Sequence, residues 1–364
     1  MHYNPRRMAT AGHAIRVIPF DSIEITMTTT PMTSDTTAVE NAPVTAAPDH
    51  APVSPAGLAA VAAAPAPSLA GRFPNGINWT NVIWLAAMHT GAVAAFWFVS
   101  WQAVAMFVVF YYLTGCFGVT LGYHRQMTHG SFQASKPVRG LLTLCAMLSG
   151  QGSPLFWIAT HRKHHAHSDG LQDPHTPNHG FWWSHFLWLQ PRDTPGELEV
   201  LFQRWAPDFY RSRLQRFLHA TYGPFLFLSA AAFFLVGHLA WDLGLSVFLW
   251  AMCTRIVVVY HVTWFVNSAT HVWGYRNYQT ADRSRNLWWV GLSAFGEGWH
   301  NNHHAYQRMA RHGHRWWEFD LTYCIIRVMK VLGLATHVVD QLPEAAKATL
   351  KGQEAPEHEV TQAA

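Results

Sequence analysis

The stretch NVIWLAAMHTGAVAAFWFVSWQAVAMFVVFYYLTG, residues 81–115, decides the fold class of this chain. It lies within a longer run, residues 73–123, that contains no Asp, Glu, Lys or Arg. Because a membrane-spanning helix needs ~20 apolar residues, this run is long enough for two spans, divided near Ser100-Trp101-Gln102. The sequence therefore predicts a first pair of membrane helices in this region.

A second apolar block runs from residue 217 to about residue 266 and is interrupted by Asp242 and Arg255. It also fits two spans, split near Trp241-Asp242-Leu243-Gly244. A charged side chain is unfavourable in lipid, so we expect Arg255 to face protein or to extend toward the membrane surface. Together the two blocks predict four spans, arranged as two hairpins.

The composition agrees with a membrane protein. The 364 residues are 50% hydrophobic and 13% charged, whereas soluble domains carry roughly 25% charged residues. The net charge of +4, with histidine neutral, gives no indication of a nucleic acid partner. Four cysteines lie in apolar stretches without a CxxC pair and are expected to be buried free thiols: Cys116, Cys145, Cys253 and Cys324.

The chain divides into three parts by composition. Residues 1–72 are rich in Ala, Pro, Thr and Ser and show no apolar period, which predicts a disordered tail. Residues 73–340 form one membrane domain, and residues 341–364 are expected to be a flexible tail.

The distribution of Lys and Arg predicts the orientation. The short connections near residues 100 and 242 contain neither, whereas residues 124–216 contain many. The positive-inside rule therefore places the termini, residues 124–216 and the polar region after residue 267 in the cytoplasm. The predicted fold is all-α, with four transmembrane helices under a cytoplasmic helical cap.

Histidine is the unusual residue, because there are 24 of them and histidine is the commonest metal ligand among side chains. Four motifs are expected on the cytoplasmic side, where they can meet: HRQMTH (124–129), HRKHH (161–165), NSATH (267–271) and HNNHH (300–304). Positions i, i+3 and i+4 share one face of a helix. By this spacing the histidines within the second motif can point together, and so can those within the fourth. His124 and His129 lie roughly 140° apart on an α-helix, so they converge best if the helix ends between them.

The motifs contain nine histidines, which are too many for one metal ion. Zinc usually takes four ligands. Nine histidines and one water molecule therefore fit two ions with about five ligands each. Imidazole suits Fe, Cu, Zn and Ni alike, so the ligands alone do not identify the metal. Among the remaining histidines, we expect His175 and His185 to orient ligands. Ordinary structural roles are expected for His89, His219 and His238, and surface positions for His312 and His314.

These motifs resemble the acyl desaturase family of the stearoyl-CoA type and its bacterial relatives, from about residue 73 to residue 333. The longer strings that carry the resemblance are LGYHR (121–125), THRKHH (160–165), DPH (173–175) and GEGWHNNHH (296–304). The resemblance implies two iron ions. One would be held by His124, His129, His161, His165 and His303. The other would be held by His164, His271, His300 and His304, with Asn267 reaching it through water.

The resemblance also implies a narrow tunnel that bends the acyl chain at the bond to be oxidised. The matching residues here are Gln151, Trp157, Thr263 and Trp264. One departure concerns the head group, because the animal enzymes have an Arg-Asp pair where this chain has Ala159 and Thr160. The carrier of the acyl chain therefore stays open between coenzyme A, acyl carrier protein and a glycerolipid.

The implied reaction uses dioxygen to insert a cis double bond of the Δ9 type, since oxidation of an unactivated C–H bond requires a metal or other cofactor. Neither GxGxxG nor GxxxxGK[ST] occurs, so two electrons must come from a separate carrier such as ferredoxin or cytochrome b5 with its reductase. The implied location is the bacterial cytoplasmic membrane, with the active site facing the cytoplasm. Two alternatives stay open: a di-iron hydroxylase of alkanes or lipids, and a non-enzymatic membrane metal-binding protein.

Overall fold

The computed structural model describes residues 70–352, which are helical with isolated β-bridges and no β-strand. The prediction of an all-α chain is confirmed for these residues, whereas nearly all of the predicted tail over 1–72 lies outside them. The helices of the first half are η1 (Ala70–Arg72), α2 (Trp79–Ala94), η2 (Ala95–Trp97), α3 (Trp101–Tyr111), η3 (Tyr112–Thr128), α4 (Lys136–Met147), α5 (Pro154–His167), η4 (Pro177–His179), α6 (Phe181–His185), η5 (Leu187–Leu189), α7 (Pro195–Trp205), α8 (Pro207–Tyr210) and α9 (Arg213–Ala220). Those of the second half are α10 (Tyr222–Trp241), α11 (Gly244–Val247), η6 (Phe248–Thr254), α12 (Arg255–Ser268), η7 (Ala269–His271), α13 (Trp288–Ser293), α14 (His300–Ala305), α15 (Leu321–Val331) and α16 (Glu344–Lys351).

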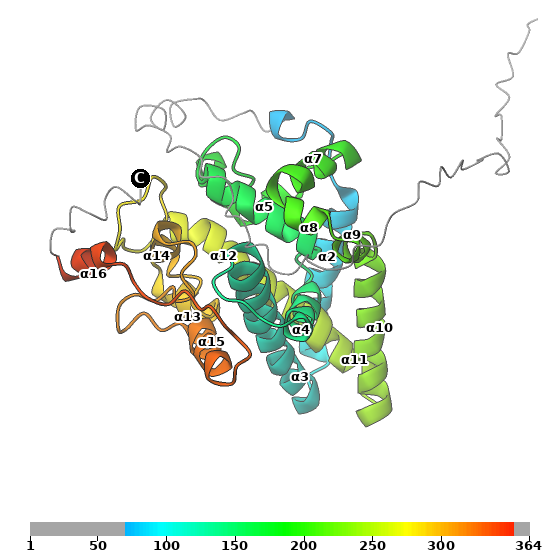
Figure 1. The fold of residues 1–364 in the computed structure, drawn as a ribbon. Coiled ribbons are helices and arrows are strands. Elements are labelled where there is room, and N and C mark those ends of the chain that lie inside the picture. The colour runs from blue at the N-terminus through cyan, green and yellow to red at the C-terminus, as the bar shows by residue number, and fades with distance from the viewer. Residues whose placement is uncertain (1–69, 353–364) are drawn as a thin grey trace, which may run out of the picture. The chain divides into compact units, whose positions relative to one another are not determined.

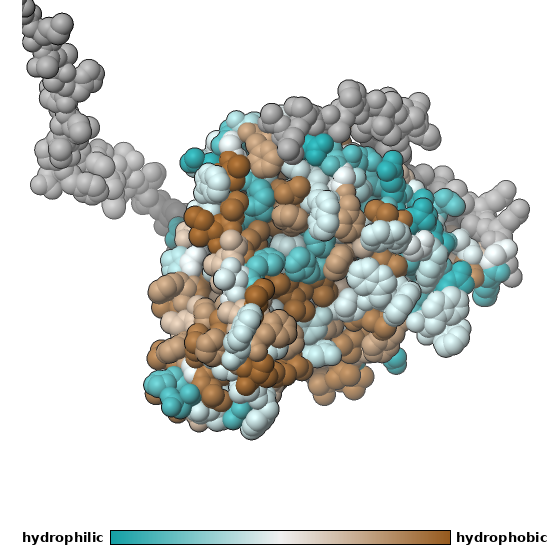
Figure 2. Space-filling view, turned by 180° about the vertical axis from the view of Figure 1, so that it is seen from behind, coloured by the Kyte–Doolittle hydropathy of each residue, from teal (hydrophilic) through white to brown (hydrophobic). Residues whose placement is uncertain are grey.

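Three helical stretches are long and apolar enough to cross a membrane: Trp101–Thr128, Tyr222–Trp241 and Gly244–His271. The divisions near residues 100 and 242 fall where the sequence predicts, whereas the outer ends of these stretches differ from the predicted blocks by five residues. The Ser100 side chain accepts a hydrogen bond from the backbone of Ala103 at the start of α3, and Asp242 ends α10 in a left-handed conformation. Large apolar side chains on these helices are exposed, and Figure 2 shows apolar residues covering much of the lower half of one face. An exposed apolar surface of this kind is typical of helices in contact with lipid.

The first of the four predicted spans is not among these three stretches. α2 has 16 residues, and η2 adds three more before the helix ends at Trp97. At ~1.5 Å per residue α2 is about 24 Å long, and η2 adds about 6 Å, which only just equals the ~30 Å of a hydrocarbon core. Crossing of the membrane by α2 therefore stays a prediction.

Arg255 faces protein, as the sequence predicts for a charged residue within a span. Its side chain is fully buried in α12, and Nε donates a hydrogen bond to the carbonyl of Ala251 at 2.8 Å. Nη1 donates to the carbonyl of Leu148, and the guanidinium lies 5.8 Å from the ring centre of Phe233. These acceptors replace the water that the cation would otherwise lose in lipid.

The helix that carries the first histidine motif is wound as a π-helix, η3. In this geometry each backbone N–H bonds to the carbonyl five residues earlier, and the amide of His129 accordingly donates to the carbonyl of His124 at 3.2 Å. The helix ends at Thr128, between these two histidines, as the sequence predicts. Its wider winding near that end turns the two rings toward the same side.

The elements that carry the histidines lie toward one end of the long helices. Figure 1 shows α5, α7 and α8 gathered there, with α13 and α14 lying beside α12. The segment predicted as a C-terminal tail contains α16 among its described residues. Two buried clusters of apolar residues fill the interior, one around η3, α4 and α5 and the other around α2, α3, η6 and α12.

Two expectations about burial are wrong. His312 and His314 are 1% and 6% exposed instead of lying on the surface, because the chain after α14 turns inward and stacks the His312 ring on that of His303. Cys324 is exposed, whereas the other three cysteines are buried free thiols as predicted. The reason is that α15 turns Thr322 and Ile326 inward and leaves Cys324 on its other face.

A glycine at the contact between η3 and α4 gives a test of this packing. A Cβ added at Gly118 would lie 2.6 Å from the backbone of Cys145 and Ala146, whereas one at Gly140 meets nothing within 4 Å. We expect Gly118→Ala to destabilise the protein by about 1–3 kcal/mol through overpacking, and Gly140→Ala to be neutral or stabilising by up to ~1 kcal/mol. Thermal unfolding of the two variants in detergent measures the difference, and equal unfolding temperatures would contradict the close approach.

Candidate metal centre and adjoining cavity

Five histidines from three segments form a first group. Their ligand atoms all lie within 4.8 Å of one another, and the members are His124, His129, His161, His165 and His303. Neighbouring Nε2 atoms are 3.0 Å apart between His124 and His303, between His303 and His165, and between His165 and His161. Nitrogen atoms of η3, α5 and α14 thus converge on one point.

Four further histidines form a second group within the same 4.8 Å limit: His164, His271, His300 and His304. The Nε2 atoms of His164 and His304 are 3.4 Å apart, and those of His271 and His300 are 3.2 Å apart. The two groups adjoin, because the ring centres of His165 and His304 are 4.7 Å apart. The structure therefore brings together all nine histidines of the four sequence motifs.

Helix α5 serves both groups at once. Ser153 caps its start by accepting a hydrogen bond from the amide of Phe156, and Pro154 occupies its first turn. One turn of helix separates His161 from His165, so both rings reach the first group, while His164 on the neighbouring side reaches the second. The short helix α14 is divided in the same way, with His303 in the first group and its other two histidines in the second.

A carboxylate lies against the outer ring nitrogen of four of the nine histidines. The Nδ1–oxygen distances are 2.8 Å for His124 and Glu297, 3.0 Å for His164 and Asp173, 3.0 Å for His271 and Asp169, and 2.5 Å for His304 and Asp282. Such a partner keeps the ring proton on Nδ1, so the lone pair on Nε2 points inward. These four acids were not among the predicted site residues, although two of them lie in quoted strings, DPH and GEGWHNNHH.

The pair His164 and His304 shows that this arrangement fits a cation. Both rings turn Nδ1 toward an acid, which favours the neutral tautomer with its proton on Nδ1, and in that tautomer two Nε2 lone pairs face each other. A positive ion beside them removes this repulsion. Ligands about 2.1 Å from a metal and at right angles stand about 3.0 Å apart, which is the separation of neighbouring nitrogens in the first group.

For several of the nine rings, burial favours the neutral form that metal ligation requires. Burial, followed by repulsion from neighbouring imidazoles, lowers the pKa of His161, His165, His300 and His303 well below the usual value. Burial alone would raise the pKa of Glu297. The pKa instead lies well below its usual value, because Arg125 first and His124 next stabilise the carboxylate. Burial also opposes the charged form of His271, but the charge and hydrogen bond of Asp169 outweigh it and raise the pKa of that ring. The site therefore places charged acids behind its imidazoles.

Arg125 holds Glu297 in place from behind. Its guanidinium is fully buried and contacts Glu297 Oε1 at 3.1 Å and Asp320 Oδ2 at 2.9 Å. The other carboxylate oxygen of Glu297 contacts His124 and lies 3.0 Å from Nδ1 of His312. His312 is thus part of the site, and no spacing in the sequence indicates this, because it enters through the turn between α14 and α15.

The two histidines expected to orient ligands behave differently. The ring centre of His175 lies 4.2 Å from that of His164, and its Nδ1 is 3.6 Å from Asp173. His185 instead contacts Ser268 and His261, at 2.9 Å and 3.1 Å. The structure therefore places His185 against Ser268 and His261 rather than against a histidine of the second motif.

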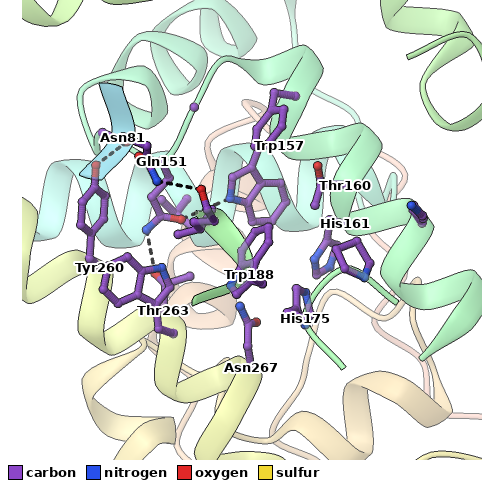
Figure 3. A pocket seen from close by; sticks show the side chains of 18 of the residues that line it. Asn81, Gln151, Trp157, Thr160, His161, His175, Trp188, Tyr260, Thr263 and Asn267 are labelled. Atoms are coloured by element: carbon purple, nitrogen blue, oxygen red, sulfur yellow. Dashed lines mark hydrogen bonds between the residues drawn. The ribbon is translucent and has the colours of Figure 1, made fainter. Parts of the chain in front are cut away.

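A large cavity reaches the metal centre. Its volume is about 1050 Å3, and its lining includes His124, His161 and His300 as well as Asn267. All four residues expected to form a tunnel also line it: Gln151, Trp157, Thr263 and Trp264. Gln151 donates a hydrogen bond to Thr263 Oγ1 at 2.8 Å and accepts one from Trp157 Nε1 at 3.2 Å, as Figure 3 shows. One polar side chain thus joins α5 to α12 across the cavity wall.

Comparison with known proteins gives one family. The family model for fatty acid desaturases matches residues 99–327. The sn-1 stearoyl-lipid 9-desaturase of Anabaena variabilis is 47% identical over 264 residues, which cover 72% of this chain and 94% of that protein. The sn-2 palmitoyl-lipid 9-desaturase of Nostoc sp. (strain 36) is 40% identical over 74% of this chain and 93% of its own. The chloroplastic palmitoyl-monogalactosyldiacylglycerol delta-7 desaturase of Arabidopsis thaliana is 40% identical over 72% and 68%.

Glu297 gives a test of the carboxylate contacts. Glu297→Gln keeps the shape of the side chain but removes the charge that orients His124, and we expect the affinity for bound metal to fall about 10- to 100-fold. The measurement is the metal retained per chain after dialysis against increasing concentrations of a chelator. Glu199→Gln, at an exposed acid of α7 that contacts Gln203 and Tyr210, is the control. Equal retention by both variants would contradict the role of Glu297.

Proposed function

The chain belongs to the fatty acid desaturase family, and on that premise we propose that it is a fatty acyl desaturase, an oxidoreductase that inserts a cis double bond of the Δ9 type into a saturated acyl chain. The observation that carries the proposal is the cavity that reaches the nine-histidine centre, where His124, His161 and His300 line it. An acyl chain in this cavity would have a methylene pair next to the centre. The printed names of two cyanobacterial relatives, both 9-desaturases acting on a lipid-linked chain, support the Δ9 position.

We propose that the centre holds two iron ions. The first would be held by the five-histidine group and the second by the four-histidine group, with Asn267 on the cavity wall reaching the second through water. When bound, the iron pair supplies the activation of dioxygen that removal of two unactivated hydrogens requires. The inward lone pairs and the acids behind the rings support this assignment.

The overall reaction balances with an external source of electrons. Dioxygen, two electrons and two protons convert one –CH2–CH2– unit into –CH=CH– and two waters. The electrons would come from a separate carrier, such as ferredoxin or cytochrome b5 with its reductase, since the chain has no nucleotide-binding motif. The protein's own part is to hold the chain still, because positioning decides which pair of hydrogens is lost.

The residues around Gln151 are proposed to position the chain. The hydrogen bonds from Trp157 to Gln151 and from Gln151 to Thr263 fix three side chains of the cavity wall relative to the centre. Trp264 lies next on the same wall, and its ring is stacked on that of Tyr260 with the ring centres 5.0 Å apart. A rigid wall of this kind would bend the chain and thereby favour the cis product.

For the membrane we propose that α2 provides a fourth span and that the histidine-bearing ends of the helices face the cytoplasm. The elements α5 to α9 and the segment after η7 would then form the cap. The absence of Lys and Arg from the connections near residues 100 and 242 supports this orientation. The location would be the cytoplasmic membrane of a bacterium.

The substrate is proposed to be an acyl chain linked to a lipid rather than to coenzyme A. Ala159 and Thr160 stand where acyl-CoA enzymes of animals carry a charged pair, and the relatives at 40% identity or more are named for lipid-linked chains. Hydroxylation at the same centre is not favoured, because these relatives are named desaturases. A metal store would not need a cavity that leads to the metal.

Expression in a host that lacks Δ9 unsaturated lipids tests the activity. We expect new cis Δ9 acyl chains, and we expect His165→Ala and His303→Ala to reduce them to background because each removes a nitrogen from the first group. Gas chromatography with mass spectrometry of the host's fatty acids gives the readout. The control is His238→Ala, at an exposed ring that contacts Asp242. Unsaturation that persists in the first two variants would refute the assignment.

Thr263 tests the positioning role of the cavity wall. Thr263→Val keeps the shape but leaves the partly buried Gln151 amide without its acceptor, a loss of stability of about 1 kcal/mol. We expect a several-fold lower rate and double bonds at more than one position, measured by mass spectrometry of derivatised products. Thr349→Val, in α16, is the matched control. A single unchanged double-bond position at an unchanged rate would show that Thr263 does not position the chain.

A further inference from the structure

A second cavity lies beside the first. Its volume is about 450 Å3, within the ~300–1,000 Å3 usual for small-molecule sites. It is lined by Val82, Leu85, Ala86 and His89 of α2 and by Phe186, Gln190, His261 and Trp264. Neither the family motifs nor the proposed chemistry uses it.

The two cavities share walls. Leu85 and Trp264 line both of them, so one side chain from α2 and one from α12 form the partition. At the start of α2, Asn81 lines the first cavity and Val82 lines the second. In the chain after α6, likewise, Leu189 lines the first cavity and Gln190 lines the second. The two cavities therefore adjoin each other along these residues.

The polar atoms in the wall of the second cavity are mostly paired within the protein. His89 and His261 contact each other through their Nε2 atoms at 3.1 Å, and the Nδ1 of His89 donates to the carbonyl of Leu85 at 2.7 Å. His261 uses its other nitrogen for His185. The wall accordingly offers no charge to a ligand, and its chemistry suits a hydrocarbon.

One acceptor remains, at Gln190. This residue is 7% exposed, its Nε2 donates to the carbonyl of Phe186 at 3.2 Å, and its buried Oε1 has no hydrogen-bond partner. Its backbone carbonyl accepts a hydrogen bond from the amide of Asn78, which fixes it beside the start of α2. A buried unpaired acceptor is unfavourable unless a donor reaches it. A hydroxyl of a lipid head group would supply that donor.

We propose that the second cavity holds the non-reacting acyl chain of an intact diacyl glycerolipid while the other chain lies in the catalytic cavity. The inference rests on the proposed function and adds a subsite to it. Two chains esterified to neighbouring glycerol carbons must lie side by side, and the two cavities adjoin at Leu85 and Trp264. A thioester of coenzyme A or of a carrier protein has a single chain and would leave the second cavity unused.

Ala86 and Ala87 provide a matched test, because both are exposed on α2 but only Ala86 lines the cavity. The full-length enzyme in nanodiscs, with a reducing system that supports the wild type, is assayed on a distearoyl glycerolipid and on the monostearoyl lipid with the same head group. We expect Ala86→Phe to raise KM for the distearoyl lipid about tenfold by filling the cavity. It should leave KM for the monostearoyl lipid unchanged, and Ala87→Phe should change neither.

Turnover of the monostearoyl lipid also shows that Ala86→Phe is folded and active. The proposal is overturned if Ala86→Phe leaves both KM values unchanged. It is equally overturned if Ala86→Phe and the smaller Ala86→Leu impair both substrates alike. A wild-type enzyme that desaturates neither lipid would instead count against the proposed function, so the two failures are distinguishable.

Discussion

The contact between a carboxylate and the outer nitrogen of an imidazole governs this site. In four places a carboxylate oxygen lies 2.5–3.0 Å from Nδ1, which favours the tautomer with a bare Nε2 turned inward, and two such nitrogens, of His164 and His304, face each other at 3.4 Å. Buried lone pairs in that arrangement are stable only with a cation among them. The acids supply the compensating negative charge from outside the ligand shell, and Arg125 in turn neutralises part of it. The fold around the histidines keeps the acids outside the imidazoles and Arg125 behind Glu297.

The membrane-type fold explains why such a centre can act on a hydrocarbon. A cavity of about 1050 Å3, lined by residues of the long apolar helices and of α5 and α7, reaches the histidines, and a second cavity adjoins it. An acyl chain can enter such a space without leaving an apolar environment, so burial does not oppose binding. The few polar groups on the wall, among them Gln151, are bonded to one another and can therefore hold a shape rather than attract water.

The sequence predicted the features that depend on local composition and spacing. The absence of charge over residues 73–123 indicated helices, and the i, i+3, i+4 spacing indicated which histidines of α5 and α14 share a side. It did not predict the π-helical winding that aligns His124 with His129, because no residue type marks that geometry. Nor did it predict the approach of His312 or of the four acids, since these contacts depend on how the chain between the helices folds, which no residue spacing indicates. The length of α2 shows the same limit, because composition gives apolarity but not where a helix ends.

Iron K-edge X-ray absorption on the purified protein, combined with iron quantification per chain, tests the central claim most directly. The account predicts two iron ions per chain, each with a first shell dominated by nitrogen and with the outer-shell scattering of several imidazole rings. A single iron per chain, or first shells made mainly of oxygen or sulfur, would contradict it, because nine inward-facing imidazole nitrogens would then not be the ligands.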